Sequence, residues 1–356
     1  MKKRIEDILI GMKLLSPEDR RGGGKNFRYD TFTQRARGQN FTIHFFQALD
    51  SHHNIKENAP TVLLASILNQ DIKLEMVLAR SFAQQGIHAV TVDTINIKDV
   101  FAALSKIEDM STMVDSLNII IRSYQKTLNW MRTRLEIDNQ KIGVFGMSFG
   151  GIVLSYISAM NSDIQAGIYA VSGCDFRDIF CHSREPAVRA ARNRIICNEW
   201  MKDSLRQSTP KSNWAWSKRP IPNHLVQRLH DQLEGFTQKV PDIYVLSPDI
   251  KKDIGNKFKD KAMILYASKD DVFTRRQNDL QWEIFGKPER IFFDRLDHYA
   301  AGFFITFVYA QKYIHWFGKR FGLSIPETIQ RKSLSIPKTY FHYLKQLIKQ
   351  KKDSSS

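Results

Sequence analysis

Short apolar runs alternate with amphipathic stretches along most of the chain. Runs of this kind are typical of strands covered on both faces of a parallel sheet, and apolar residues three and four positions apart predict helices. The runs that we assign to buried strands are 61–65, 88–93, 141–145, 166–172, 262–267 and 290–296. Because helical patterns separate most of them, the order predicts an α/β protein with a mostly parallel central sheet flanked by helices.

The clearest helical pattern covers residues 112–134, where apolar side chains recur on one face. Its stripe consists of Met113, Leu117, Ile120, Ile121, Tyr124, Leu128 and Met131. We expect this stripe to pack in the core rather than to line a cofactor site. Residues 27–49 predict two short strands joined around Gly38, and a single apolar helix is expected at 300–317.

The alternation breaks at residues 176–240, which are basic, helix-like and interrupted by prolines. Because this stretch lies between two predicted strands, we expect it to form a helical cap above the sheet. The predicted organisation is an N-terminal basic extension, a first core part, the cap, a second core part and a basic C-terminal extension. Their respective ranges are 1–26, 27–175, 176–240, 241–322 and 323–356.

The charge distribution separates this core from its additions. The 356 residues carry a net charge of +16, yet residues 61–175 and 241–310 together carry −2. Residues 340–352 form a basic amphipathic pattern, which favours peripheral contact with an anionic membrane; docking of its apolar stripe on the protein's own core is the alternative. Charge alone does not distinguish lipid from nucleic acid, and we expect nucleic acid not to be the partner.

The start of the chain resembles a signal peptide only briefly, because Glu6 and Asp7 interrupt the apolar region that would follow Met1–Arg4. No stretch approaches the roughly 20 apolar residues that a spanning helix requires. Three cysteines without zinc spacing predict free thiols in a reducing compartment. We therefore expect a cytoplasmic protein, with peripheral membrane association left open.

The most specific motif is the pentapeptide Gly146–Gly150, which has Ser148 at its centre. It follows a predicted strand and precedes an apolar helix, the context of a nucleophile elbow. Such a turn strains the backbone of the nucleophile, and the flanking glycines leave room where a Cβ would clash. The motif predicts that Ser148 attacks an acyl carbon.

A serine hydroxyl needs a base, and the base needs an orienting carboxylate. Asp270 and His298 each lie just beyond a predicted strand, at the sheet edge where Ser148 is expected. Asp271 and, more weakly, Asp175 are reserve candidates for the acid. Asp297 is expected to be a turn carboxylate.

Residues 27–318 resemble the α/β-hydrolase superfamily, which has its triad in the order Ser, Asp or Glu, His. The segment 267–273 is similar to the acid turn of that family, and the resemblance implies that Asp270 is the triad acid. The stretch 115–151 is similar in layout to the dienelactone hydrolase, acetyl xylan esterase and prolyl oligopeptidase branch.

One position departs from the family, which usually has His-Gly after the first central strand. This chain has Ala65-Ser66 there. A backbone donor needs no particular side chain, so the Ile67 and Phe149 N–H groups are the expected oxyanion hole.

The sequence thus predicts a serine hydrolase that cleaves an ester, thioester or related acyl bond of a small-molecule or lipid-like substrate through an acyl-enzyme. No cofactor or metal is required. An acyltransferase with the same triad is one alternative. A basic membrane- or nucleic-acid-binding protein on a hydrolase scaffold, with weak or lost activity, is the other; it draws on the aromatic and basic cluster 214–219. We favour the enzyme because a pure binder has no use for a complete triad.

Overall fold

The computed structural model describes residues 27–65, 74–201 and 221–325. Its centre is an eight-stranded sheet in the order β1-β2-β4-β3-β5-β6-β7-β8. The strands are β1 (Phe27–Ala36), β2 (Gln39–Ala48), β3 (Ala59–Ala65), β4 (His88–Asp93), β5 (Ile137–Met147), β6 (Ile164–Ala170), β7 (Ala262–Ala267) and β8 (Glu289–Phe293).

The sheet is parallel from β4 to β8, and antiparallel pairing is confined to the β1–β2 hairpin and its junction with β4. The predicted mostly parallel α/β fold is therefore confirmed. Strand β8 ends at Phe293, three residues earlier than the sequence pattern predicts. Residues 294–296 instead form a turn in which Arg295 has a φ of 62° and donates its N–H to Ser268 Oγ at 2.8 Å.

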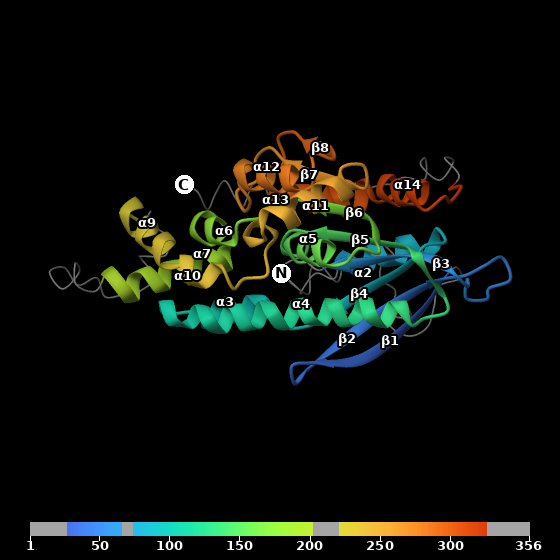
Figure 1. Cartoon of the computed structure of the whole chain (residues 1–356), viewed down its shortest axis with the longest axis horizontal. Coiled ribbons are helices and arrows are strands. Elements are labelled where there is room, and N and C mark those ends of the chain that lie inside the picture. Colours follow the sequence, from blue (N-terminus) through green and yellow to red (C-terminus); the bar gives the residue numbers. More distant parts are fainter. Residues whose placement is uncertain (1–26, 66–73, 202–220, 326–356) are drawn as a thin grey trace, which may run out of the picture.

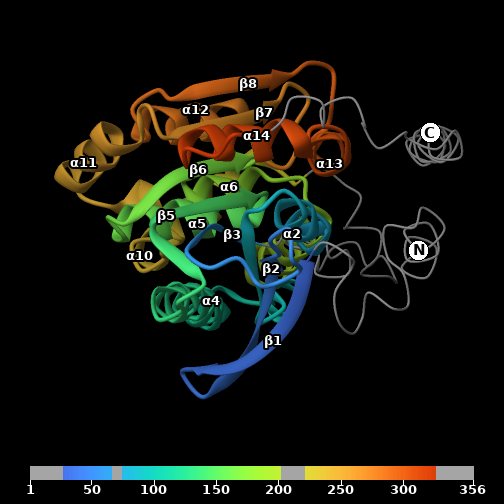
Figure 2. The same ribbon diagram turned by 90° about the vertical axis from the view of Figure 1, so that its right-hand side faces the viewer.

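Helices cover both faces of the sheet (Figure 2). On one face Phe82 and Phe317 pack against strand residues such as Phe145, and on the other Leu117 and Leu154 pack against residues such as Val144. The helices outside the region between β6 and β7 are α2 (Leu74–Gln84), α3 (Ile97–Ala103), η2 (Ile107–Asp109), α4 (Met110–Arg132), α5 (Phe149–Met160), α12 (Arg275–Ile284), α13 (His298–Phe303), η6 (Phe304–Val308) and α14 (Ala310–Arg320). Within the described ranges, no helix is long and apolar enough to cross a membrane.

The prediction of a single helix at residues 300–317 is wrong. The structure has α13, a π-helical turn η6 and α14, with Tyr309 (φ −102°, ψ 0°) between the last two. In the wider π turn, Phe303 stacks on Phe307 with 4.6 Å between ring centroids. Because residues 300–310 are apolar apart from Thr306, the pattern does not reveal where the hydrogen-bond register changes.

Several helices lie between β6 and β7. They are α6 (Phe176–His182), α7 (Pro186–Ile196), η3 (Cys197–Met201), α9 (Asn223–Gln232), α10 (Glu234–Thr237), η5 (Ile243–Val245) and α11 (Pro248–Phe258). Helices α6, α7, α9 and α10 gather at one end of the molecule, on the left of Figure 1. The carboxylate of Glu185 accepts the N–H groups of Ala187 and Val188 and so begins α7 at Pro186. The cap boundaries 176 and 240 stay a prediction, and the cluster 214–219 lies outside the described residues.

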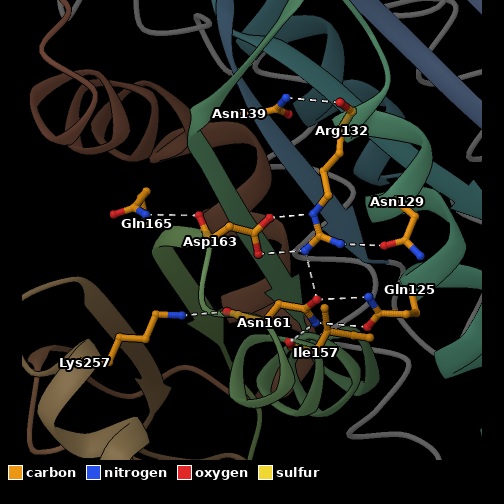
Figure 3. A network of polar contacts seen from close by, with 9 residues as sticks. All are labelled: Gln125, Asn129, Arg132, Asn139, Ile157, Asn161, Asp163, Gln165 and Lys257. Carbon is orange, nitrogen blue, oxygen red and sulfur yellow. Dashed lines mark hydrogen bonds and ion pairs between the residues drawn. The ribbon is translucent and has the colours of Figure 1, made fainter.

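A polar network fixes the end of α5 that is remote from Ser148 (Figure 3). Arg132 of α4 binds both carboxylate oxygens of Asp163 at 2.7 Å and also donates to Asn161. The side chains of Asn161 and Gln125 exchange two amide hydrogen bonds. Lys257 of α11 donates to the backbone carbonyl oxygen of Asn161 at 2.6 Å. This network holds α4, α5 and α11 together at the edge where the parallel strands begin.

Candidate active site

Ser148 lies in a strained turn between β5 and α5. Its φ is 55° and its ψ is −125°, a conformation that non-glycine residues rarely adopt. Its backbone N–H donates to the Ala170 carbonyl at the end of β6 at 2.9 Å. A Cβ on Gly146 would lie 2.5 Å from the Gly150 carbonyl oxygen, so the turn requires glycine there. The strain is maintained by neighbouring backbone and presents the hydroxyl beyond the strand ends.

His298 follows β8 and is the first residue of α13. The carboxylate of Asp297 accepts the Ala300 N–H at 2.9 Å, so Asp297 caps this short helix. The Nε2 atom of His298 lies 2.9 Å from Ser148 Oγ, and both residues are buried. The turn after β8 thus places an imidazole directly against the hydroxyl of the elbow.

Asp270 follows β7, and its two carboxylate oxygens have separate roles. One accepts the N–H groups of Val272 and Phe273, each at 2.9 Å, while the other lies 2.9 Å from His298 Nδ1. An ionised carboxylate only accepts, so the proton of a neutral His298 ring must be on Nδ1. Nε2 is then free to accept the Ser148 proton, as a general base requires.

Apolar side chains surround the imidazole. The Phe273 ring lies 5.5 Å from it at 40°, and the exposed Tyr299 ring lies 5.5 Å away at 90°. Phe273 continues into a small apolar cluster with Phe149, Ile152, Ile179 and Val272. The two rings limit rotation of the imidazole, and His298 itself is 6% exposed.

The other predicted acids have different partners. Asp175 is buried and caps α6 by accepting the Asp178 N–H, and its second oxygen lies 3.5 Å from Arg276. Burial raises the pKa of the Asp175 carboxyl. Asp271 contributes its backbone carbonyl, which accepts the Arg184 N–H at 2.9 Å. Of the candidate acids, Asp270 is the one that the structure brings to His298.

One of the two expected oxyanion donors can be located. Phe149 is the first residue of α5, and the first N–H groups of a helix have no intrahelical acceptor. This N–H therefore lies at the positive end of α5, beside Ser148. Ile67 lies outside the described residues, although β3 ends at Ala65 in register with Gly146.

Sequence reasoning missed a set of buried amides on α12. Gln277, Asn278 and Gln281 are all fully buried. Gln281 bridges Ser155 on α5 and Ser172 after β6, at 2.8 and 3.0 Å, and Gln277 binds Asp178 of α6. The available signal was the presence of three amide side chains in a ten-residue helix that covers a sheet and has only Leu280, Trp282 and Ile284 as apolar residues. Among the described residues, no group of three metal-binding side chains could hold an ion.

Comparison with known proteins gives a fold. No family model matches the chain, and no curated protein matches it. A hypothetical protein from Pseudomonas aeruginosa matches at 10% identity and a TM-score of 0.53, over 86% of this chain and 98% of its own. A putative dipeptidyl aminopeptidase IV from Bacteroides ovatus matches at 12% identity and a TM-score of 0.50, over 83% of this chain and 36% of its own. A cold-adapted esterase from an Arctic intertidal metagenomic library matches at 11% identity and a TM-score of 0.47, over 84% of this chain and 97% of its own.

The strand order and the two matches with TM-scores of 0.50 and 0.53 show that the chain has the α/β-hydrolase fold. The superfamily resemblance of the sequence is thereby confirmed at the level of fold.

Proposed function

We propose that this protein is a serine hydrolase that cleaves an ester, thioester or related acyl bond. The observation that carries the proposal is the continuous chain of contacts from Ser148 Oγ to His298 Nε2 and from His298 Nδ1 to Asp270, each 2.9 Å long. The strained backbone of Ser148 adds support, because strain of this kind clusters at functional sites.

In the proposed reaction, Ser148 Oγ attacks the carbonyl carbon while His298 Nε2 accepts the hydroxyl proton. The tetrahedral intermediate collapses as His298 returns this proton to the leaving alcohol or thiol. Water then attacks the acyl-Ser148 ester with His298 again as the base, which releases a carboxylic acid and restores the hydroxyl. Asp270 holds the ring in the tautomer that both halves of the reaction need.

The Phe149 N–H is the first proposed donor to the oxyanion. The second is the Ile67 N–H, which follows the end of the strand adjacent to β5. Such donors contribute most when they point to the oxygen that gains charge in the transition state. Because backbone groups serve this role, Ala65 and Ser66 in place of His-Gly remain compatible with activity.

Labelling with a fluorophosphonate probe tests the assignment of the nucleophile. Ser148→Ala should abolish labelling and lower kcat on p-nitrophenyl acetate by on the order of 10⁶-fold, with an unchanged melting curve. Ser162→Ala, an exposed serine after α5, is the matched control and should label like the parent protein. Labelling that persists in Ser148→Ala would overturn the assignment.

The acyl group and the acceptor need a second experiment. A panel of p-nitrophenyl esters of increasing acyl length identifies the preferred substrate. Adding an alcohol or amine acceptor then separates hydrolysis from acyl transfer, because a transferase diverts the acyl group away from water. A protein with an intact fold that reacts with neither the probe nor any ester would favour the binding-scaffold alternative.

A further inference from the structure

The first helix after β6 contacts the turn that carries the acid. Helix α6 contributes Ile179 to the apolar cluster that contains Val272 and Phe273. Just after α6, the Arg184 N–H donates to the Asp271 carbonyl at 2.9 Å. The acid turn, residues 270–274, is therefore held by contacts with α6 and Arg184 as well as by its own strand β7.

Gln277 links this turn to α6 through both ends of its amide. Its Oε1 accepts the Thr274 N–H at 2.8 Å, and its Nε2 donates to Asp178 Oδ2 at 2.7 Å. Its side chain is fully buried, and a Cβ on Gly173 would come within 2.9 Å of its own Cβ. A buried amide with both ends bonded has one orientation available.

Asp178 fixes the polarity of that amide. It also pairs with Arg276 at 3.1 Å and with His182 at 3.0 Å. Burial works against ionisation of Asp178, but the hydrogen bonds from His182 and Gln277 outweigh it and hold the pKa below its ordinary value. An ionised carboxylate can only accept, so Gln277 must present its NH₂ group to Asp178 and its oxygen to Thr274.

The two ends of the acid turn are thus held by different groups. Asp270 closes the start of the turn on the Val272 and Phe273 N–H groups, while Gln277 holds the next N–H, that of Thr274. A shift of the turn moves the carboxylate that orients His298. Misplacement by about 1 Å is enough to cost on the order of 100-fold in rate.

We propose that Gln277 is a positioning residue for Asp270 and that Asp178 of α6 is its anchor. The helix that follows β6 would then help to set the geometry of the triad in addition to covering it. This inference rests on the proposed function, in which Asp270 orients His298.

A reciprocal exchange of donor and acceptor tests the proposal. Gln277→Glu keeps an oxygen for the Thr274 N–H but places a second carboxylate against Asp178. In the double variant Gln277→Glu/Asp178→Asn, the Asn NH₂ group can donate to the Glu carboxylate. The bond is then restored with reversed polarity, and the double variant has the net charge of the parent protein. Gln34→Glu, at an exposed position on β1, controls for the added charge.

Two readouts are measured on each full-length variant. The first is kcat and KM on p-nitrophenyl acetate, and the second is the NMR resonance of the His298 Nδ1 proton, which reports the bond to Asp270 without requiring turnover. We expect Gln277→Glu to lower kcat by about 10- to 100-fold with little change in KM, and to shift or broaden the proton resonance. The double variant should recover kcat to within about fivefold, as coupled residues do.

An unchanged kcat and proton resonance in Gln277→Glu would overturn the proposal, as would a double variant that melts like the parent protein but recovers neither readout. If Gln277→Glu does not fold, Gln277→Met carries the same test, because it removes both hydrogen bonds without adding charge. Ser148→Ala is assayed in parallel. A parent protein whose activity does not depend on Ser148 contradicts the proposed function, while the NMR result still decides the positioning of Asp270.

Discussion

A polar network lies at each edge of the parallel sheet, one where the strands begin and one beyond the strand ends, and the two networks differ in charge balance. At the edge remote from Ser148, Arg132 binds both oxygens of Asp163. Burial alone would raise the pKa of Asp163, but the hydrogen bonds and charge of Arg132 hold it below its ordinary value. The carboxylate of Asp163 therefore has a close partner of opposite sign (Figure 3), whereas Lys257 donates to the Asn161 backbone carbonyl and burial lowers its pKa to about 8.

At the edge that carries Ser148, carboxylates are crowded. Asp175 and Asp178 share Arg276, and Asp242 is fully enclosed, where it accepts the N–H groups of Phe176 and Tyr244. Burial raises the pKa of Asp242 to about 6 and also raises the pKa of Asp175. The first network favours the charged form of its carboxyl, whereas the second contains Asp175 and Asp242, whose charged forms burial disfavours. The comparison shows that a guanidinium bound to both carboxylate oxygens outweighs burial at Asp163, whereas backbone N–H donors do not outweigh it at Asp242.

The largest expected effect separates the triad acid from its neighbour. In Asp270→Asn, the amide oxygen is needed by the Val272 and Phe273 N–H groups, so the NH₂ group faces His298 Nδ1 and forces the proton onto Nε2. The ring can then no longer accept the Ser148 proton, and kcat should fall by about 10⁴-fold without loss of stability. Asp271→Asn is the matched control, measured on the same ester. If Asp271→Asn lowers kcat strongly and Asp270→Asn lowers it only slightly, Asp271 is the acid instead of Asp270.

The next effect concerns pH and the crowded network. Because the folded pKa of Asp242, about 6, exceeds its ordinary value of 3.8, its contribution to stability is full below pH 4 and is lost as pH rises through 6. A pKa shift of about two units corresponds to a change of about 3 kcal/mol in the free energy of unfolding. Urea unfolding between pH 4 and 7 should show a shallower decline for Asp242→Asn than for the parent protein. Parallel declines would mean that other groups control the pH dependence.

A substitution in the network of Arg132, Asp163 and Asn161 should change the stability of the protein and not its kcat. Arg132→Met leaves the half-buried Asp163 and the buried Asn161 without their shared donor and should lower the free energy of unfolding by about 2 kcal/mol. The kcat should be unchanged because the network lies at the far end of α5. Arg28→Met breaks an exposed pair with Asp30 and should cost less than about 1 kcal/mol. A fall in kcat for Arg132→Met would show that the two networks are coupled through α5.

The smallest effect is expected at the reserve acid. Asp175→Asn keeps an oxygen that can cap α6, and Asp175 has no contact with His298 among the described residues. Its kcat should stay within about threefold of the parent protein, as expected for a residue outside the triad. A loss as large as that of Asp270→Asn would place Asp175 in the triad instead.

Much of the fold follows from local pattern. The apolar runs predicted β4 and β7 with their observed ends, because a strand buried on both faces leaves a continuous hydrophobic signature. The elbow was equally local, since Gly146 and the strained Ser148 are close in the chain. The break in the helix at 300–317 was not predicted, because the nearly continuous apolar residues at 300–310 conceal a change of hydrogen-bond register.

What the sequence by itself determined was the α/β fold and a serine at a strand-to-helix turn, because periodicity and tight turns depend on neighbours in the chain. The family resemblance of the sequence favoured Asp270 over Asp271 and Asp175, and the tertiary structure places the Asp270 carboxylate 2.9 Å from His298 Nδ1. Only the tertiary structure decided the contact between Gln277 and Asp178, which are 99 positions apart, and the one between Phe176 and Asp242, which are 66 apart. Such polar contacts leave no periodic trace in the sequence; their geometry exists only after the sheet has brought the strand ends together.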